Sequence, residues 1–336
     1  MDACRLNWCL RVVEADEVSD RVSVLFVGAS GRSGSTLVGR VLGQNPGFFD
    51  VGELRFIWER GIQKNQLCGC GQAFHSCEFW NAVGEEAFGG FDKVNIDEVL
   101  ALKSAVDRQR YIPHHIMAAK RKLKNSEMVG RLDRYGAILE RLYRAVQSVS
   151  GAKVIVDSSK AAPYAFMLNA LPFIDLRLVY LQRDSRAVAY SWSRRKLRPE
   201  IWNRKEFMSQ IEPLAIAREW PVHSCLLDYL SRMVEFSTLL RYEDFVREPA
   251  LWNKKVLTEL ELDTAAGPPI VRRHKVTLAA NHSVAGNPMR FQVGDIEVHP
   301  DEEWKMKMKG VDKTIVTAIT LPLLYRYGYL GREKRQ

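Results

Sequence analysis

Short apolar runs alternate with longer segments of helical periodicity along this chain. Residues 22–27 are mostly apolar and rich in β-branched side chains, residues 176–181 are also mostly apolar, and 154–156 is a third, shorter run. Runs of this length are typical of buried strands. Shortly after the run at 22–27, residues 35–42 place apolar side chains at helical spacing. The alternation predicts an α/β fold, with a central, mostly parallel sheet flanked by helices in a three-layer α/β/α arrangement.

Residues 91–150 are predicted to be mostly helical. One apolar face in their last part ends before Gly151, a residue suited to a helix C-cap, and this face consists of Leu132, Tyr135, Leu139, Leu142, Val146 and Val149. Further helices are expected around 164–168 and over 185–196, and residues 239–244 have the pattern of a fourth strand end. These helices are expected to cover both faces of the sheet.

The order of the elements predicts one domain. It spans residues 21–330 with a helical insertion at about 90–150, after a lead-in at 1–20 and before a basic tail at 331–336. Of the 336 residues, 46% are hydrophobic and 26% are charged. This composition matches a globular protein and excludes a disordered, collagen-like or coiled-coil chain.

The net charge of +9 favours an anionic ligand, but it is too dilute over 336 residues to indicate a nucleic-acid partner. The basic runs 120–124 and 194–198 are interpreted as solvated faces. No run approaches the roughly 18 apolar residues of a membrane-spanning helix, so no integral membrane segment is expected. The first residues make a poor signal peptide, and we therefore expect a cytoplasmic protein.

Polar residues gather where the predicted strands end, which is where parallel α/β sheets bind ligands. Residues 28–34 form a glycine- and serine-rich loop that opens a helix, a combination that binds anions through backbone N–H groups. The pattern G-x-x-x-x-G-K-[ST] of triphosphate loops is not met, because Ser35 stands where lysine is required and Ala29 where the first glycine is. The cation of this loop is Arg32. The alternative interpretation is a glycine turn without a ligand.

The segment Gly-Arg-Ser-Gly-Ser-Thr-Leu at 31–37 resembles the 5′-phosphosulfate loop of the sulfotransferases, which use 3′-phosphoadenosine 5′-phosphosulfate (PAPS). The resemblance implies a fold like that of the P-loop nucleoside triphosphatases. It also implies that the co-substrate binds to Ser30, Gly31, Arg32, Ser33, Gly34, Ser35 and Thr36. The chain looks closer to the bacterial and tyrosylprotein-type branches of the family than to the cytosolic phenol-type branch.

A second segment resembles the 3′-phosphate site of that family. In it Arg183, at a strand end, precedes Ser191 on the next helix by eight positions. Arginine offers a planar fork for phosphate oxygens, and two helical turns allow the hydroxyl group to face the same ligand. Arg195, one turn beyond Ser191, is expected to join them. The alternative is a solvated basic helix face.

Two later segments extend the resemblance. Tyr242, in Arg-Tyr-Glu-Asp-Phe, resembles a strand-end tyrosine near the nucleotide, although a core tyrosine fits the pattern equally well. The polar loop 281–290 resembles the loop that closes over the nucleotide. We select Gly286, Asn287 and Arg290 from it as nucleotide-binding residues.

Sulfuryl transfer needs a base that takes the proton of the acceptor. Glu53 follows the first helix in a Gly-Glu pair that resembles the one in the Glu-base members of the family, and we predict it to be that base. Asp50 is the second choice. The alternative for Glu53 is a surface carboxylate paired with Arg55 or Arg60.

Lys160 matches the position of a family lysine near the transferred group, and with Arg32 it is expected to neutralise charge on the sulfuryl and phosphate oxygens. We therefore predict a PAPS-dependent sulfotransferase that requires no metal for the reaction. The acceptor group is expected to be a hydroxyl of a small molecule, carbohydrate or phenol, with an amine as second choice, and the sequence does not identify the acceptor itself. The alternatives are a P-loop kinase-like phosphotransferase and a non-catalytic anion-binding protein. The sequence does not indicate the oligomeric state.

Four residues with metal-binding side chains lie within ten positions: Cys68, Cys70, His75 and Cys77. The C-x-C spacing is tighter than the usual C-x₂₋₄-C of zinc sites. A structural loop with reduced or disulfide-linked thiols is therefore expected ahead of a zinc site or a redox role. Cys225 is predicted to lie in the core.

Overall fold

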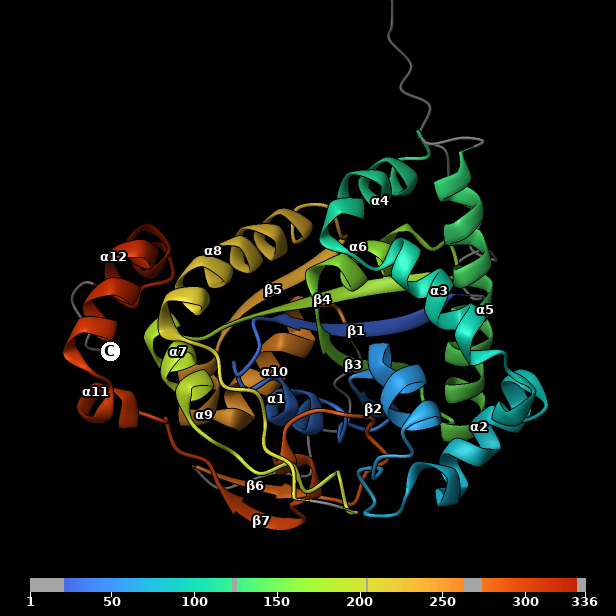
Figure 1. The fold of residues 1–336 in the computed structure, drawn as a ribbon, viewed down its shortest axis with the longest axis horizontal. Coiled ribbons are helices and arrows are strands. Elements are labelled where there is room, and N and C mark those ends of the chain that lie inside the picture. The colour runs from blue at the N-terminus through green and yellow to red at the C-terminus, as the bar shows by residue number, and fades with distance from the viewer. Residues whose placement is uncertain (1–20, 123–125, 204, 263–273, 331–336) are drawn as a thin grey trace, which may run out of the picture.

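The centre of the molecule is a sheet of five parallel strands, in the spatial order β2-β3-β1-β4-β5 (Figure 1). The strands are β1 Val22–Ala29, β2 Phe48–Gly52, β3 Val154–Lys160, β4 Ile174–Gln182 and β5 Phe236–Arg241. The structure is a computed structural model that describes residues 21–122, 126–203, 205–262 and 274–330. The predicted lead-in at 1–20 and tail at 331–336 lie outside the described residues.

Helices cover both faces of the sheet, which confirms the predicted three-layer α/β/α fold (Figure 1). Those on one face are α1 Ser35–Leu42, α9 Tyr242–Arg247 and α10 Pro249–Glu259, and those on the other include α5 Glu127–Ser150, α6 Ala162–Ala170 and α8 Pro213–Leu230. Neighbouring residues of β1 serve the two layers, because Leu25 belongs to one core cluster and Phe26 to the other.

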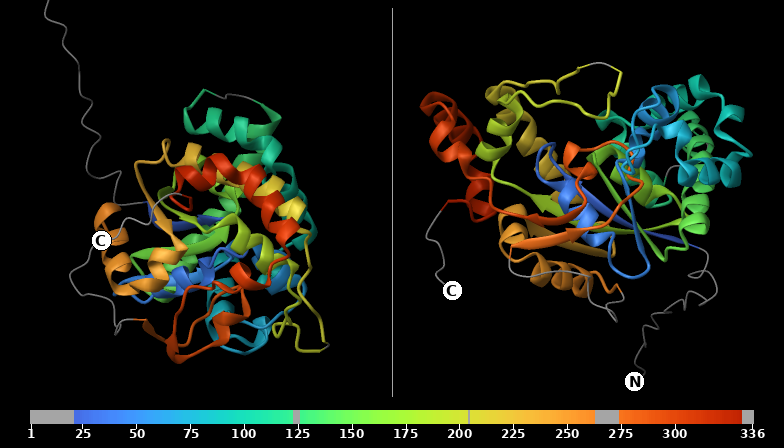
Figure 2. Two further views of the ribbon diagram at one scale, coloured as in Figure 1. Left: turned by 90° about the vertical axis from the view of Figure 1, so that its left-hand side faces the viewer. Right: turned by 90° about the horizontal axis from the view of Figure 1, so that it is seen from below.

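The remaining elements surround these layers. The predicted helical region at about 90–150 contains α5 and two further helices, α3 Ile96–Val106 and α4 Ile112–Ala119. The elements before and after it are α2 Glu78–Phe88, α7 Ser185–Ser193, β6 Lys275–Leu278, β7 Gly294–Glu297, α11 Glu303–Lys307 and α12 Gly310–Arg326. Strands β6 and β7 pair with each other in antiparallel fashion. Figure 2 shows α11 and α12 in red, beside α7 and α8. None of the helices in the described part of the chain is long and apolar enough to cross a membrane.

The strand order creates a ligand-binding position at the carboxyl end of β1. This strand lies between β3 and β4, and the register pairs Gly28 with Lys160 and Ala29 with Leu181, so three strand ends meet there. The helices that follow β1 and β3 lie on opposite faces, since α1 belongs to one core and α6 to the other. Ligands of open α/β sheets bind where neighbouring connections diverge in this way.

Two sequence predictions need correction, and one strand was not predicted. Strand β2 was not expected, because it has only five residues and carries the polar Asp50 in its middle. The helix expected at 185–196 ends at Ser193, since Arg194 has an extended backbone. Cys225 was assigned to the core but is exposed on α8.

Candidate active site

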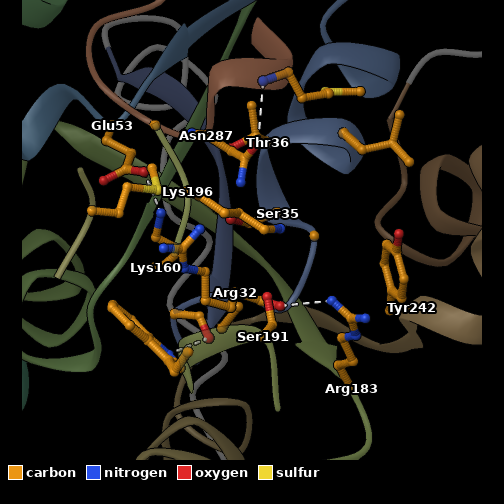
Figure 3. A pocket seen from close by; sticks show the side chains of 18 of the residues that line it. Arg32, Ser35, Thr36, Glu53, Lys160, Arg183, Ser191, Lys196, Tyr242 and Asn287 are labelled. Carbon is orange, nitrogen blue, oxygen red and sulfur yellow. Dashed lines mark hydrogen bonds and ion pairs between the residues drawn. The ribbon is translucent and has the colours of Figure 1, made fainter. Parts of the chain in front are cut away.

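A cavity of about 720 Å³ lies over the carboxyl ends of β1 and β3. Its walls come from the turn after β1, the segment after β2, the end of β3, α7 with the chain that follows it, and the segment 286–301. Figure 3 shows the turn between two groups of side chains, with Glu53 and Lys160 on one side and Arg183 and Tyr242 on the other. The cavity therefore joins residues that are far apart in the chain, from position 29 to position 301.

The turn after β1 opens the cavity to the N-terminus of α1. Arg32 (φ 67°) and Gly34 (φ 89°) both have left-handed backbone, and Gly34 is the N-cap of α1. Gly34, Ser35 and Thr36 line the cavity, and the first turn of α1 contains no acidic side chain. A helix N-terminus whose own first turn carries no acidic side chain attracts an anion through its N–H groups and its dipole.

Arg32 supplies a cation whose terminal nitrogens are free to bind a ligand. Both terminal nitrogens of its guanidinium are buried without a hydrogen-bond partner among the residues that the structure describes. The group lies over the ring of Trp192, 4.9 Å from its centroid, and burial lowers the pKa of Arg32. A buried guanidinium without partners is costly. An anion bound in the cavity would supply the missing acceptors.

Gly34 is required both for its backbone and for its lack of a side chain. A Cβ atom at this position would stand 2.2 Å from the ring of Tyr242, at a φ that disfavours other residues. We expect Gly34→Ala to lower the free energy of unfolding by at least about 1–2 kcal/mol, measured by urea denaturation. The matched control is Gly130→Ala on α5, where a Cβ meets nothing within 4 Å. It should raise stability by about 0.5–1 kcal/mol, and a Gly34→Ala variant as stable as the parent would contradict this account.

Arg183 lies directly beside the turn. Its Nη1 donates to the carbonyl oxygen of Arg32 at 2.9 Å, and its Nη2 contacts Asp301 Oδ2 at 3.1 Å. The guanidinium stacks over Tyr242, 4.7 Å from the ring centroid, and the same ring covers Gly34. Ser191 on α7 lines the cavity between Arg32 and Arg183 (Figure 3). The two predicted anion sites therefore adjoin on one side of the molecule.

Glu53 and Lys160 form an ion pair at the opposite side of the turn (Figure 3). The Glu53 side chain is only 7% exposed, and its backbone N–H donates to Val284. A Cβ on Gly286 would stand 3.5 Å from Glu53 Oε1, so the loop at residues 281–290, called the late loop below, packs closely on the carboxylate. The alternative partners expected for Glu53 are engaged elsewhere, because Arg55 pairs with Asp107 and Arg60 stacks on Phe56. The pair brings a proton acceptor and a cation to one point of the cavity wall.

Asp50, the second-choice base, is buried on β2 and does not line the cavity. Its Oδ1 accepts a hydrogen bond from the backbone of Gly52, and burial raises the pKa of Asp50 to about 7. The structure therefore does not support Asp50 as the base.

The raised pKa of Asp50 predicts a pH effect on stability. A buried acid whose pKa rises on folding adds stability below its unfolded pKa of about 4, and this stability is lost as the pH rises through 7. Asp50→Asn should flatten the decline in unfolding free energy between pH 4 and 8 by on the order of a few kcal/mol, measured by urea denaturation at each pH. Asp133→Asn, at an exposed position of α5, is the control. A variant profile that parallels the parent would refute the assignment.

The cavity brings together most of the residues predicted from the sequence. Those that line it are Gly31, Arg32, Gly34, Ser35, Thr36, Glu53, Lys160, Arg183, Ser191, Tyr242, Gly286 and Asn287. The backbone N–H of Asn287 donates to Thr36 Oγ1 at 3.2 Å, which joins the late loop to the turn. Ser30 and Ser33 belong to the turn but do not line the cavity, and Ser33 is buried.

Two predicted nucleotide ligands lie outside the cavity. Arg195 is exposed and stacks on Phe207, because the end of α7 at Ser193 removes it from the turn after Ser191. Arg290 is fully buried and donates to the carbonyl oxygens of Ser283 and Leu67. Burial lowers the pKa of Arg290 to about 10. Both assignments are corrected: Arg290 holds the late loop in place, and Arg195 covers a surface aromatic ring.

Several lining residues were not predicted. Trp192 donates from Nε1 to the carbonyl oxygen of Gly31 at 3.2 Å and supports Arg32. Lys196 had been interpreted as part of a solvated face, but it lines the cavity, and burial lowers its pKa, with Arg32 as a further cause. The position of Trp192 next to Ser191 was an available signal. The sequence contained no signal for the contact of Asp301 with Arg183, because the two residues lie 118 positions apart in the chain.

The cysteine cluster lies outside the cavity and has a different histidine from the one predicted. His75 contacts the carbonyl oxygen of Ile62 through Nε2. The imidazole that joins Cys68, Cys70 and Cys77 belongs to His282, and the four ligand atoms lie within 4.8 Å of one another. The cysteines are free thiols.

Comparisons with known proteins give structural similarity without sequence similarity. No protein-family model matches the chain, and no curated protein matches it. Among solved structures, the chain is similar to the sulfotransferase domain from the curacin biosynthetic pathway, with a TM-score of 0.46 and 14% identity over 90% of this chain and 97% of that one. It is also similar to sulfotransferase STF9 from Mycobacterium avium, with a TM-score of 0.44 and 13% identity over 93% of this chain and 79% of that one.

Proposed function

We propose that this chain is a sulfotransferase that moves the sulfuryl group of PAPS to a hydroxyl group of a small-molecule acceptor. An amine is the second choice of acceptor. The observation that carries the proposal is the contact between Arg183 and the turn that holds Arg32. Two adjoining anion-binding groups in one cavity suit a ligand with two separate anionic ends, as an adenosine 3′,5′-bisphosphate core has.

Each end of such a nucleotide has candidate partners. The N-terminus of α1 and the unpartnered guanidinium of Arg32 suit the 5′-phosphosulfate. Arg183 and Ser191 suit the 3′-phosphate, and Asp301 would yield its contact with Arg183 to the stronger phosphate acceptor. Tyr242 touches both groups, since its ring packs on Gly34 and under Arg183.

The proposed reaction is an in-line displacement at sulfur. The acceptor oxygen forms a bond to sulfur while its proton passes to the Glu53 carboxylate. The bond between sulfur and the bridging phosphate oxygen breaks, and its electron pair leaves with adenosine 3′,5′-bisphosphate. Lys160 and Arg32 stabilise the negative charge that gathers on that oxygen. The ion pair between Glu53 and Lys160 supports these roles, because it joins the base and a cation at one point.

The acceptor is proposed to bind beyond Glu53. The cavity wall there contains Phe56, with the guanidinium groups of Arg55 and Arg60 stacked on its ring at 5.4 and 4.3 Å. An aromatic face edged by cations suits a phenolic or carbohydrate acceptor that carries polar groups.

A kinase-like phosphotransferase is less well supported. A triphosphate loop needs a lysine where Ser35 stands, and a magnesium site needs a free carboxylate at a strand end. Asp157 on β3 is the nearest candidate, but Ser159 N–H and the Tyr143 hydroxyl group donate to its two oxygens in the buried core. A non-catalytic anion-binding protein would not need Glu53 beside Lys160.

Transfer of label tests the proposal. The purified chain is incubated with sulfur-labelled PAPS and a panel of phenols, carbohydrates, amino alcohols and amines, and products are identified by mass spectrometry. A sulfated product with release of adenosine 3′,5′-bisphosphate is expected. Phosphoryl transfer from magnesium ATP to the same panel, without sulfuryl transfer, would overturn the proposal in favour of the kinase-like alternative.

A further inference from the structure

Three thiols and one imidazole converge on a single point beside the candidate active site. Cys68, Cys70 and Cys77 come from the segment before α2, and His282 comes from the loop after β6, 205 residues beyond Cys77. Cys68 and Cys77 are buried, while Cys70 and His282 are partly exposed. The fold therefore brings an imidazole from a distant part of the chain to three cysteines that are close together in the sequence.

The distances among these atoms fit one tetrahedral ion. Sγ of Cys77 lies 3.6 Å from Sγ of Cys68 and 3.8 Å from Sγ of Cys70, and Nδ1 of His282 lies 3.2 and 3.9 Å from Sγ of Cys77 and Cys68. Zn–S bonds of about 2.3 Å and a Zn–N bond of about 2.0–2.1 Å at tetrahedral angles require about 3.8 Å between sulfurs and about 3.5 Å from sulfur to nitrogen. These four distances lie around those values, and the two remaining distances, from Sγ of Cys70 to Sγ of Cys68 and to the His282 nitrogen, are at most 4.8 Å.

We propose that Cys68, Cys70, Cys77 and His282 bind one zinc ion. Four protein ligands leave no open position, which is typical of a structural zinc site and not of a catalytic one. Three thiolates with one imidazole select zinc over magnesium or calcium. This inference does not depend on the proposed function.

The surroundings hold the ligands in place. Gly71 (φ 87°) turns the chain after Cys70, which lets the backbone N–H of Cys68 donate to Gln72 at 2.7 Å. The His282 ring stacks on Phe79 with the centroids 5.0 Å apart, and Trp80 Nε1 donates to the carbonyl oxygen of His282 at 2.7 Å. Neighbouring residues that fix the orientation of the ligands in this way are typical of metal sites in proteins.

The ion would brace the loop that backs the candidate active site. The residues after His282 continue to Val284, whose N–H donates to Val51 and whose carbonyl oxygen accepts from Glu53 N–H. The same loop reaches Gly286 and Asn287 at the cavity wall. Zinc would thus join the cysteine segment to the backbone that positions Glu53, in a role that is structural and not chemical.

Metal content tests the proposal directly. The full chain is prepared without a chelator and without a metal-binding tag, and its metal content is measured by elemental mass spectrometry. We expect about one zinc ion per chain. Cys77→Ser and His282→Gln should lose the ion. The matched controls are Cys225→Ser and His75→Gln, which change the same residue types outside the cluster and should keep it.

A second measurement uses only the parent protein, so it still tests the proposal if the variants fail to fold. Parent protein depleted of zinc by a chelator is titrated with Co²⁺, and a thiolate-to-cobalt absorption band with the visible bands of tetrahedral cobalt is expected. The proposal is overturned by a parent chain that lacks zinc and gives no such bands, or by one whose cysteines prove to be disulfide-linked. Loss of zinc from His75→Gln with retention in His282→Gln would overturn the ligand assignment.

Discussion

Glu53→Gln should abolish most turnover while leaving nucleotide binding intact. Glutamine keeps the size of the side chain but does not accept the acceptor proton, and general-base catalysis contributes about 10²–10⁴-fold. We therefore expect kcat to fall by about that factor, measured with sulfur-labelled PAPS. Affinity for adenosine 3′,5′-bisphosphate, measured by calorimetry, should change little, because Glu53 lies on the far side of the turn from Arg183 (Figure 3).

The control for this variant is Glu86→Gln, an exposed glutamate on α2. It should turn over like the parent. The Glu53→Gln variant loses an ion pair with Lys160, so its unfolding free energy is measured alongside. A folded Glu53→Gln variant with the kcat of the parent would remove Glu53 as the base.

Arg32→Ala and Arg183→Ala should each weaken binding of adenosine 3′,5′-bisphosphate by about 10–100-fold. A hydrogen bond to a charged group contributes about 1.5–3 kcal/mol, which corresponds to this range in Kd. Within the described part of the chain, the terminal nitrogens of Arg32 have no hydrogen-bond acceptor, so both are available to a ligand. Arg183 exchanges its contact with Asp301 for phosphate, which places its expected effect at the lower end of the range.

Arg195→Ala is the matched control for both variants. It removes the same charge from a nearby segment, but Arg195 is exposed and stacks on Phe207 outside the cavity. Its affinity for the nucleotide should stay within about twofold of the parent. Equal losses in all three variants would show that only the net charge matters, which would contradict two defined anion sites.

The parts of the fold that the sequence predicted are those with local signals. The apolar runs at β1, β3 and β4 and the helical faces of α1 and α5 carry their own periodicity, and the layer architecture follows from their alternation. Glycine and serine spacing marked the turn after β1 because backbone conformation is encoded locally. Gly34 confirms this, with its positive φ at the N-cap of α1.

The parts that the sequence did not predict depend on contacts between distant segments. Arg290 and Arg183 look alike in the chain, but folding buries one among carbonyl oxygens and leaves the other at the cavity. His282 replaces His75 beside the cysteines because the late loop returns over 200 residues to that position. The prediction for Arg195 was wrong because α7 ends a few residues earlier than expected. The sequence pattern locates the ends of helices poorly.

The central claim is that one cavity holds both ends of an adenosine bisphosphate. Nucleotide selectivity tests this claim most directly. The parent chain is titrated by calorimetry with adenosine 3′,5′-bisphosphate, adenosine 5′-monophosphate and magnesium ATP. We expect the bisphosphate to bind at least about tenfold more tightly than either other nucleotide, since only it engages Arg183 and the turn together. Equal affinity for adenosine 3′,5′-bisphosphate and adenosine 5′-monophosphate, or tightest binding of magnesium ATP, would contradict the claim.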